Sequence, residues 1–283
     1  MKPGIYNMSD EDYFADEAIN NSGLKEVLRS PAHYKWKKDH PKEQTASMLG
    51  GKALHCAILE PDAFNERYAV LPEDAPAAPT KAMINAKNPS DSSVERVLFW
   101  EAFNIASEGK DILKADVAAD CLHVAKMVRG HPELAAYFER GKAEHAIFAQ
   151  DPVTGVMCKC KPDYLTKVGE YRVKIELKSA DDARERFFTR SVMNYGYFQG
   201  AAFYTDIMDW SPLGPPDLYL MVVMEREAPY GIKIYEVTPS AIAYGRRQYR
   251  KALDLYAYCV TNGEWPNYDT EITPLNLPAW VKE

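Results

Sequence analysis

The chain has 283 residues, of which 46% are hydrophobic and 27% charged, and its formal net charge is −7. This length is enough for one large domain or two small ones, and the composition is that of an ordinary globular protein. The acidic balance excludes a protein that coats nucleic acid by charge alone, but it leaves room for local basic patches.

The first part of the chain favours helices. Residues 22–40 carry a helical pattern with two start signals, because Ser22 is suited to cap one turn and Ser30 precedes Pro31 as an N-cap would. Residues 48–60 form a second helical segment. The Pro-, Ala-, Asn- and Ser-rich residues 72–92 predict a long loop or partly ordered insertion. Residues 93–139 return to helical periodicity in two or three pieces.

From residue 143 the pattern changes to the alternation typical of strands. The order of the elements is helices, strands, a helix, strands and a final helix, which predicts a mixed α/β core behind a helical front half. We expect strands at 144–149, 156–161, 171–178, 217–224 and 230–237, and helices at 190–208 and 239–261.

The candidate chemistry lies in the expected hairpin that leads into strand 171–178. Along this strand Glu176 and Lys178 share one face, about 7 Å apart. If the hairpin closes around Gly169 and Glu170, Asp163 falls directly opposite Glu176. Opposed residues of an antiparallel pair project to the same side, with Cβ atoms about 5 Å apart. Two carboxylates and an ammonium group would then converge.

Hydrolysis of a phosphodiester requires this combination of groups. Mg²⁺ prefers oxygen ligands and is usually held by one or two carboxylates together with water and substrate phosphate. The ion polarises the phosphoryl group and lowers the pKa of its water, and a lysine orients or deprotonates that water or stabilises charge on the phosphate. The alternative is a surface hairpin with an ordinary Glu–Lys pair, because so short a pattern often occurs by chance.

The five cysteines are an odd number and are scattered along the chain. Cys158 and Cys160 form the only close pair, and we interpret them as two small buried side chains, since no second pair completes a zinc site. An iron–sulfur cluster, which needs four cysteines at suitable spacing, is not expected. The acidic start of the sequence lacks the apolar run of a signal peptide, and no membrane-spanning run occurs. We expect a cytoplasmic protein.

Two basic stretches stand out against the acidic background. For each of them alone, a solvated helix face is the better interpretation than a nucleic-acid contact. They comprise Arg29 with Lys35, Lys37, Lys38 and Lys42, and Arg246 with Arg247, Arg250 and Lys251.

Further motifs resemble the RecE-type exodeoxyribonuclease VIII family of the PD-(D/E)XK superfamily, to which RecB-type and lambda-type exonucleases also belong. Residues Gly51 to His55 are similar to the Gly-x3-His element that precedes the nuclease core there. The resemblance extends from Pro3 to Trp280 and is weakest at 75–92. Similar stretches follow in the same order at 22–25, 28–34, 158–163, 199–204 and 263–266.

The resemblance implies a ligand set for a divalent metal and a catalytic lysine. His55, Asp163 and Glu176 would be metal ligands, with the Leu177 backbone carbonyl and Glu144 as further candidates. Lys178 would be the catalytic lysine, acting together with Asp163, Glu176 and Gln199.

The resemblance also implies DNA contacts outside the metal site. Gln199 would position DNA or the attacking water, and Tyr195 lies one helical turn earlier on the expected helix. Arg29 and Ser30 are suited to a terminal phosphate, and Ser22 to a similar contact, although simple helix capping explains both serines equally well.

Two positions depart from the family pattern. Glu176 stands where the RecE sequence has aspartate, a change that the superfamily accepts and that affects metal geometry rather than activity. The RecB-type Gln-x3-Tyr element here has Phe203 in place of tyrosine, with Tyr204 one position later.

The resemblance implies a single PD-(D/E)XK domain over residues 1–283, with a mainly helical part at 1–142 and the nuclease core and C-terminal helix at 143–283. It implies a Mg²⁺- or Mn²⁺-dependent exonuclease that degrades double-stranded DNA processively from 5′ to 3′ ends. A toroidal homotetramer and a RecT-type single-strand annealing partner in phage-type recombination belong to the same expectation. The alternatives are a Cas4-like or repair nuclease acting on single strands, and a DNA-binding protein whose nuclease core has decayed.

Overall fold

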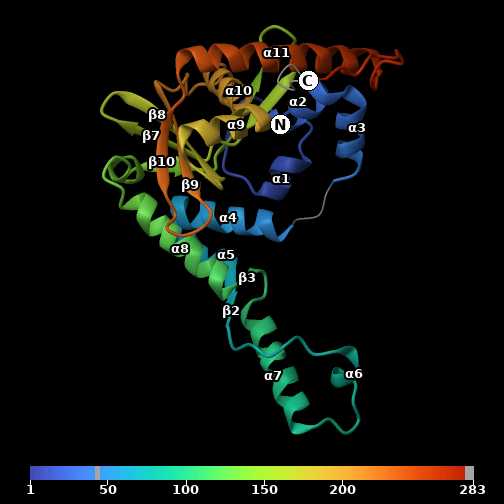
Figure 1. Cartoon of the computed structure of the whole chain (residues 1–283), viewed down its shortest axis with the longest axis vertical. Coiled ribbons are helices and arrows are strands. Elements are labelled where there is room, and N and C mark those ends of the chain that lie inside the picture. Colours follow the sequence, from blue (N-terminus) through green and yellow to red (C-terminus); the bar gives the residue numbers. More distant parts are fainter. Residues whose placement is uncertain (42–44, 278–283) are drawn as a thin grey trace.

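A five-stranded mixed sheet forms the centre of the computed structural model, which describes residues 1–41 and 45–277 (Figure 1). The two central strands, β8 and β9, are parallel, and the other neighbouring pairs are antiparallel. In spatial order the strands are β10 (Ile232–Glu236), β9 (Leu218–Glu225), β8 (Tyr171–Ala180), β7 (Tyr164–Val168) and β4 (Gly141–Ala143).

Helices cover both faces of this sheet. On one face α4 (Ala46–Leu59) and α8 (Ala115–Arg129) pack against Val173, Ile175 and Leu177 of β8. On the other face α9 (Glu185–Tyr195) and α10 (Tyr197–Asp209) pack against alternate residues of β9. The expected class, a mixed α/β fold with a central sheet flanked by helices, is confirmed.

A smaller antiparallel sheet carries the chain's first strand. It has the order β1 (Gly4–Tyr6), β5 (Ala146–Gln150) and β6 (Met157–Cys160). Its inner face packs against α2 (Asn21–Arg29), α10 and the long helix α11 (Pro239–Asn262). Cys158 and Cys160 are fully buried in this contact, as two small core side chains would be. Helices α1 (Asp10–Ala15) and α3 (Pro31–Asp39) complete this side.

An arm projects from the body at the residues expected to form an insertion. Strands β2 (Tyr68–Leu71) and β3 (Asp111–Lys114) pair in parallel at its base, and Figure 1 shows α6 (Lys81–Ile84) and α7 (Asp91–Ala106) extending away from the central sheet. The connecting elements are α5 (Phe64–Arg67) and the 3₁₀ turns Pro61–Ala63 and Ala135–Phe138. The short strands β1 to β4 were not predicted, because three or four residues are too few to establish a period of two.

Helix boundaries follow the expected signals with two corrections. Ser30 caps α3 and Pro31 occupies its first turn, as predicted. Ser22 lies inside α2, and Asn20 is the residue that caps it. The helix expected at 190–208 is two helices, because Gly196 adopts the left-handed conformation at φ 63° and ends α9. Within the described residues no helix has the length and apolarity needed to span a membrane.

Candidate metal centre

The β7–β8 hairpin has the predicted register. Tyr164 pairs with Ile175, and Gly169 adopts φ 58° in the turn, so Asp163 lies opposite Glu176 just before β7 begins. The Asp163 carboxylate accepts a hydrogen bond from the Leu177 backbone N–H at 2.7 Å, which fixes it against β8. Asp163 is buried, and its side chain points to the same side as Glu176.

Three side chains from distant parts of the chain meet at this point. His55 of α4, Glu144 and Asp163 each offer one ligand atom, and these atoms lie within 4.8 Å of one another. The Nδ1 atom of His55 is 3.9 Å from the Glu144 carboxylate and 3.8 Å from the Asp163 carboxylate. Ligands of an octahedral Mg²⁺ are about 3 to 4 Å apart when each sits about 2.1 Å from the ion. The spacing and the donor set therefore fit a divalent metal ion.

Glu144 occupies a strained position where the chain passes from one sheet to the other. It lies between β4 of the central sheet and β5 of the smaller one, with φ at 53°. A left-handed conformation costs a non-glycine residue on the order of 1 kcal/mol. The backbone N–H of Glu144 donates to the Asp163 carbonyl oxygen at 3.1 Å, which holds the two acidic residues together.

Glu176 lies next to this cluster but is held by lysines. The ammonium groups of Lys174 and Lys178 contact its two carboxylate oxygens, Lys178 at 2.7 Å. Lys174 is fully buried and also donates to the Tyr219 hydroxyl at 2.8 Å. Burial alone would raise the pKa of Glu176, but the two ammonium groups outweigh it and lower that pKa. Three of the expected ligands, His55, Glu144 and Asp163, thus form the cluster, and Glu176, also expected as a ligand, lies beside it with its carboxylate held by the two lysines.

Burial and neighbouring charges shift the pKa values of two members of the cluster, Asp163 and His55. Burial, together with the neighbouring Glu176 carboxylate, raises the pKa of Asp163. Burial disfavours the charged form of His55, but the Asp163 charge and the contact with Glu144 outweigh it and raise the pKa of the imidazole. A cation bound by the three side chains would compete with the proton on His55, which is the usual coupling between metal binding and ligand deprotonation.

A large cleft opens beside the centre. It has a volume of about 1020 Å³ and includes His55 and Glu144 in its lining. Asp10 of α1 lies across it and pairs with Lys52 at 2.9 Å and with Lys161 at 2.6 Å. The cleft is large enough for a polymer strand, and four basic side chains lie along it: Lys52, Arg67, Lys110 and Lys161.

Comparison with known proteins identifies the family. A model described as a PDDEXK-like domain of unknown function (DUF3799) matches residues 20–275, which is nearly the whole chain. The chain belongs to this family. The superfamily expected from the motifs is therefore confirmed, whereas the likeness to RecE-type exonucleases in particular stays a prediction. No curated protein sequence matches the chain.

Solved structures add support for the fold of this PDDEXK-like domain. The crystal structure of a protein from Eubacterium rectale, described as a "putative exonuclease", matches with a TM-score of 0.57 at 12% identity, covering 96% of this chain and 97% of the other. At that identity the likeness shows the fold alone. The structure of SSO0001 gives a TM-score of 0.32 at 12% identity, over 73% of this chain and 86% of the other, and carries no argument.

Gln199 and Tyr195 are not neighbours on one helix of the PDDEXK-like domain. Gly196 separates them, so Tyr195 ends α9 and is largely exposed, while Gln199 is buried in the first turn of α10. The Gln199 amide donates to the Asn21 side chain at 3.1 Å. Tyr195 stacks on Tyr197, with ring centres 5.7 Å apart. The expectation of one shared helical face is wrong, because it assumed an uninterrupted helix.

Two of the three residues expected to contact DNA phosphate, Arg29 and Ser30, contact other side chains. Ser30 is buried, caps α3 and bonds to His33 at 2.6 Å, so helix capping accounts for it. Ser22 is exposed on α2, and the Arg29 guanidinium lies 3.5 Å from the Tyr268 hydroxyl. The Leu177 side chain is in the core, and because its N–H faces Asp163, we expect its carbonyl to face the same edge.

Most of the basic stretches are likewise paired within the domain. Three lysines of the first stretch form ion pairs. Lys35 pairs with Asp39 of α3, Lys37 with Glu26 of α2, and Lys38 with Glu17 between α1 and α2. Arg246 and Arg250 bind buried aspartates. Arg246 and Arg250 thus support the fold and do not form only the solvated helix face that the sequence suggested, and Lys42 lies outside the described residues.

Sequence reasoning missed three residues of the centre. Lys174 was seen only as one alternating strand residue, although the spacing Lys174, Glu176, Lys178 on one strand face was a usable signal. The motifs assign no role to Lys161, although it lies within 158–163, or to Asp10, because their pairing brings together residues 151 positions apart. That contact follows from the fold and has no local pattern.

Proposed function

We propose that this chain is a divalent-metal-dependent nuclease that hydrolyses the phosphodiester bonds of DNA. The observation that carries the proposal is the convergence of His55, Glu144 and Asp163 beside the Glu176–Lys178 pair, at the edge of a large cleft. The family match, a PDDEXK-like domain, supports the same class of chemistry.

The side chains have separable roles in this proposal. His55, Glu144 and Asp163 would hold the metal, which when bound supplies positive charge to the phosphate and an acidified water. Burial lowers the affinity of Lys178 for its proton, but the Glu176 and Asp163 carboxylates outweigh it and raise the pKa of Lys178. Lys178 therefore stays an ammonium group and acts on charge at the phosphate rather than as a base. Glu176 positions it at 2.7 Å.

The finer proposal is a Mg²⁺- or Mn²⁺-dependent exonuclease that degrades double-stranded DNA from 5′ ends, with ring assembly and a RecT-type annealing partner. Its support is the RecE-type resemblance of the motifs rather than any single contact. The competing single-strand nuclease differs in substrate and not in chemistry. The two are distinguished by which DNA is degraded.

The decisive experiment follows the loss of end label from linear duplex, linear single strand and closed circular duplex in the presence of Mg²⁺. Wild type should degrade the linear duplex. Asp163→Asn and Lys178→Met should each reduce the rate by more than about 100-fold, which exceeds the loss caused by removing a residue that only supports a metal ligand. Asp217→Asn, at an exposed aspartate paired with Arg172, is the matched control. Equal rates for all four proteins would exclude the catalytic assignment.

A further inference from the structure

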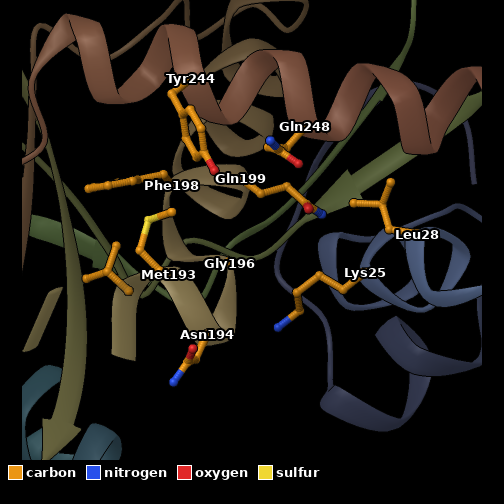
Figure 2. Close-up of a pocket in the computed structure, with 10 residues that line it drawn as sticks. Lys25, Leu28, Met193, Asn194, Gly196, Phe198, Gln199, Tyr244 and Gln248 are labelled. Atoms are coloured by element: carbon orange, nitrogen blue, oxygen red, sulfur yellow. The ribbon is translucent and has the colours of Figure 1, made fainter. Parts of the chain in front are cut away.

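A second hollow lies beside the first turn of α10. It has a volume of about 260 Å³ and lies between α2, the α9–α10 junction and α11. Figure 2 shows Tyr244 and Gln248 reaching from α11 toward Gly196, with Lys25 of α2 and Met193 of α9 on either side. Gln199, which the sequence motifs associate with DNA, is part of the same wall.

Two glycines set the positions of the helices around this hollow. Gly196 adopts the left-handed conformation that separates α9 from α10. At Gly245 a Cβ atom would collide with the Phe198 backbone carbonyl, so glycine lets α11 approach α10 with no side chain between them. Tyr244 and Gln248 are four residues apart on either side of this contact and therefore share a helix face over the hollow.

The candidate catalytic lysine is not part of the lining, but it lies near Tyr197, the chain neighbour of two lining residues. The Lys178 ammonium lies 5.2 Å from the centre of the Tyr197 ring, and Tyr197 sits in the chain between the lining residues Gly196 and Phe198. Lys25 donates to the Tyr195 carbonyl at 3.1 Å. Burial, and secondly the charge of Lys178, lowers the pKa of Lys25, which is consistent with the two ammonium groups lying near each other.

The lining has the chemistry of a nucleotide site. Tyr244, Phe198 and Met193 supply aromatic and thioether surface for the face of a base. The side-chain amides of Gln248 and Asn194 offer both donors and acceptors for a base edge. Gln199 keeps its carbonyl oxygen for a ligand, because its amino group is already bonded to Asn21. Lys25 adds one positive charge.

From this arrangement we propose that the hollow binds one unstacked nucleotide of the substrate strand, next to the phosphate that is cleaved. At about 260 Å³ the hollow can enclose one base with part of its sugar, but not a base pair. The Lys25 ammonium would take the nucleotide's phosphate, and the α11 side chains would contact its base. The inference rests on the proposed nuclease function and assigns a substrate-holding role to Tyr244 and Gln248.

Direct binding tests the site without any cleavage. Calorimetry in EDTA would measure dAMP, dTMP and inorganic phosphate with wild type, Tyr244→Ala and Gln248→Leu. We expect both nucleotides to bind, and each variant to bind them about tenfold more weakly, because Tyr244→Ala removes a base-stacking contact and Gln248→Leu removes a hydrogen bond to the base edge. Tyr258→Ala, at an exposed tyrosine of the same helix, is the matched control and should bind as wild type does. Gln248→Leu keeps the side-chain volume, and thermal unfolding would verify that each variant folds.

Three results would overturn the proposal: no nucleotide binding by wild type, phosphate binding as tight as nucleotide binding, or equal weakening by Tyr258→Ala. Cleavage of linear duplex is measured separately, where we expect KM to rise about tenfold in both pocket variants with a smaller change in kcat. Nucleotide binding by a wild-type protein that cuts no DNA would refute the nuclease and leave the pocket standing. Normal cleavage without nucleotide binding would refute the pocket alone.

Discussion

Carboxylates are buried in two regions of this molecule, beside α11 and in the candidate metal centre. Beside α11, Asp151 is fully buried and binds both the guanidinium of Arg250, at 2.6 Å, and Thr154. Asp206 is bound in the same way by Arg246 and Tyr249. In the metal centre, Asp163 faces Glu144 and Glu176 as well as His55.

The pKa values of Asp151 and Asp163, one buried aspartate from each region, shift in opposite directions. Burial would raise the pKa of Asp151, but the Arg250 and Thr154 hydrogen bonds outweigh it and lower that pKa. Burial and a second carboxylate raise the pKa of Asp163. A buried charge is stable only when it is paired or bound to a metal. Asp151 is paired with an arginine, whereas Asp163 shares its surroundings with two further carboxylates and a histidine.

The largest expected effect on folding is in the α11 region. Asp151→Asn leaves Arg250 without its buried partner and should lower the free energy of unfolding by about 2–3 kcal/mol, toward the low end for a buried pair because Arg250 is partly exposed. Urea unfolding at neutral pH measures it, with exposed Asp217→Asn as control at under about 1 kcal/mol. Equal losses in the two variants would mean that burial of the pair does not matter.

The same pair predicts a pH dependence. The folded-state pKa of Asp151 lies below its unfolded value, so its stabilisation is present above that unfolded value and is lost as pH falls through the folded pKa. Between pH 5 and 3, wild type should therefore lose stability more steeply than Asp151→Asn. Parallel curves for the two proteins would contradict this assignment.

In the metal centre, replacing a buried aspartate by asparagine should raise the free energy of unfolding instead of lowering it. The folded-state pKa of Asp163 is raised, so its charge destabilises the metal-free protein above that pKa, and the penalty disappears as pH falls through it. Asp163→Asn should stabilise the protein in EDTA by about 1–2 kcal/mol at pH 8. It should also abolish stabilisation by Mn²⁺, measured as a shift in Tm. Destabilisation in EDTA would break the comparison.

A smaller effect is expected at the strained Glu144. Glu144→Gly removes the left-handed penalty at φ 53° and should stabilise the metal-free protein by about 1 kcal/mol. The same change removes one ligand group and should weaken Mn²⁺ binding in calorimetry. Glu144→Gln separates the two effects, since it removes the charge and keeps the strain. Equal stability of the glycine and glutamine variants would argue against stored backbone strain.

Local patterns were sufficient to predict the hairpin that carries Asp163, Glu176 and Lys178. The alternation of 171–178 and the glycine at the turn leave one register that buries Val173, Ile175 and Leu177 together. A slip by one residue would turn every side chain to the other face, so the register is strongly determined. The same kind of local signal predicted the Ser30 cap of α3.

Contacts between distant segments were outside the reach of these patterns. Glu144 was expected within a strand, but it precedes β5 and turns because neighbouring strands belong to different sheets. The break at Gly196 separates Tyr195 from Gln199, since a helical period alone does not reveal where packing ends a helix. The clamp of Glu176 by Lys174 required knowing that Lys174 is buried and that Tyr219 lies beside it on the neighbouring strand β9.

The sequence by itself determined the superfamily, the order of the main elements and the hairpin register, because side-chain periodicity and turn chemistry act over a few neighbouring residues. Only the tertiary structure decided which carboxylate completes the cluster with His55 and Asp163. That choice depends on how two sheets and α4 pack, and the backbone strain at Glu144 is tolerated only within that packing.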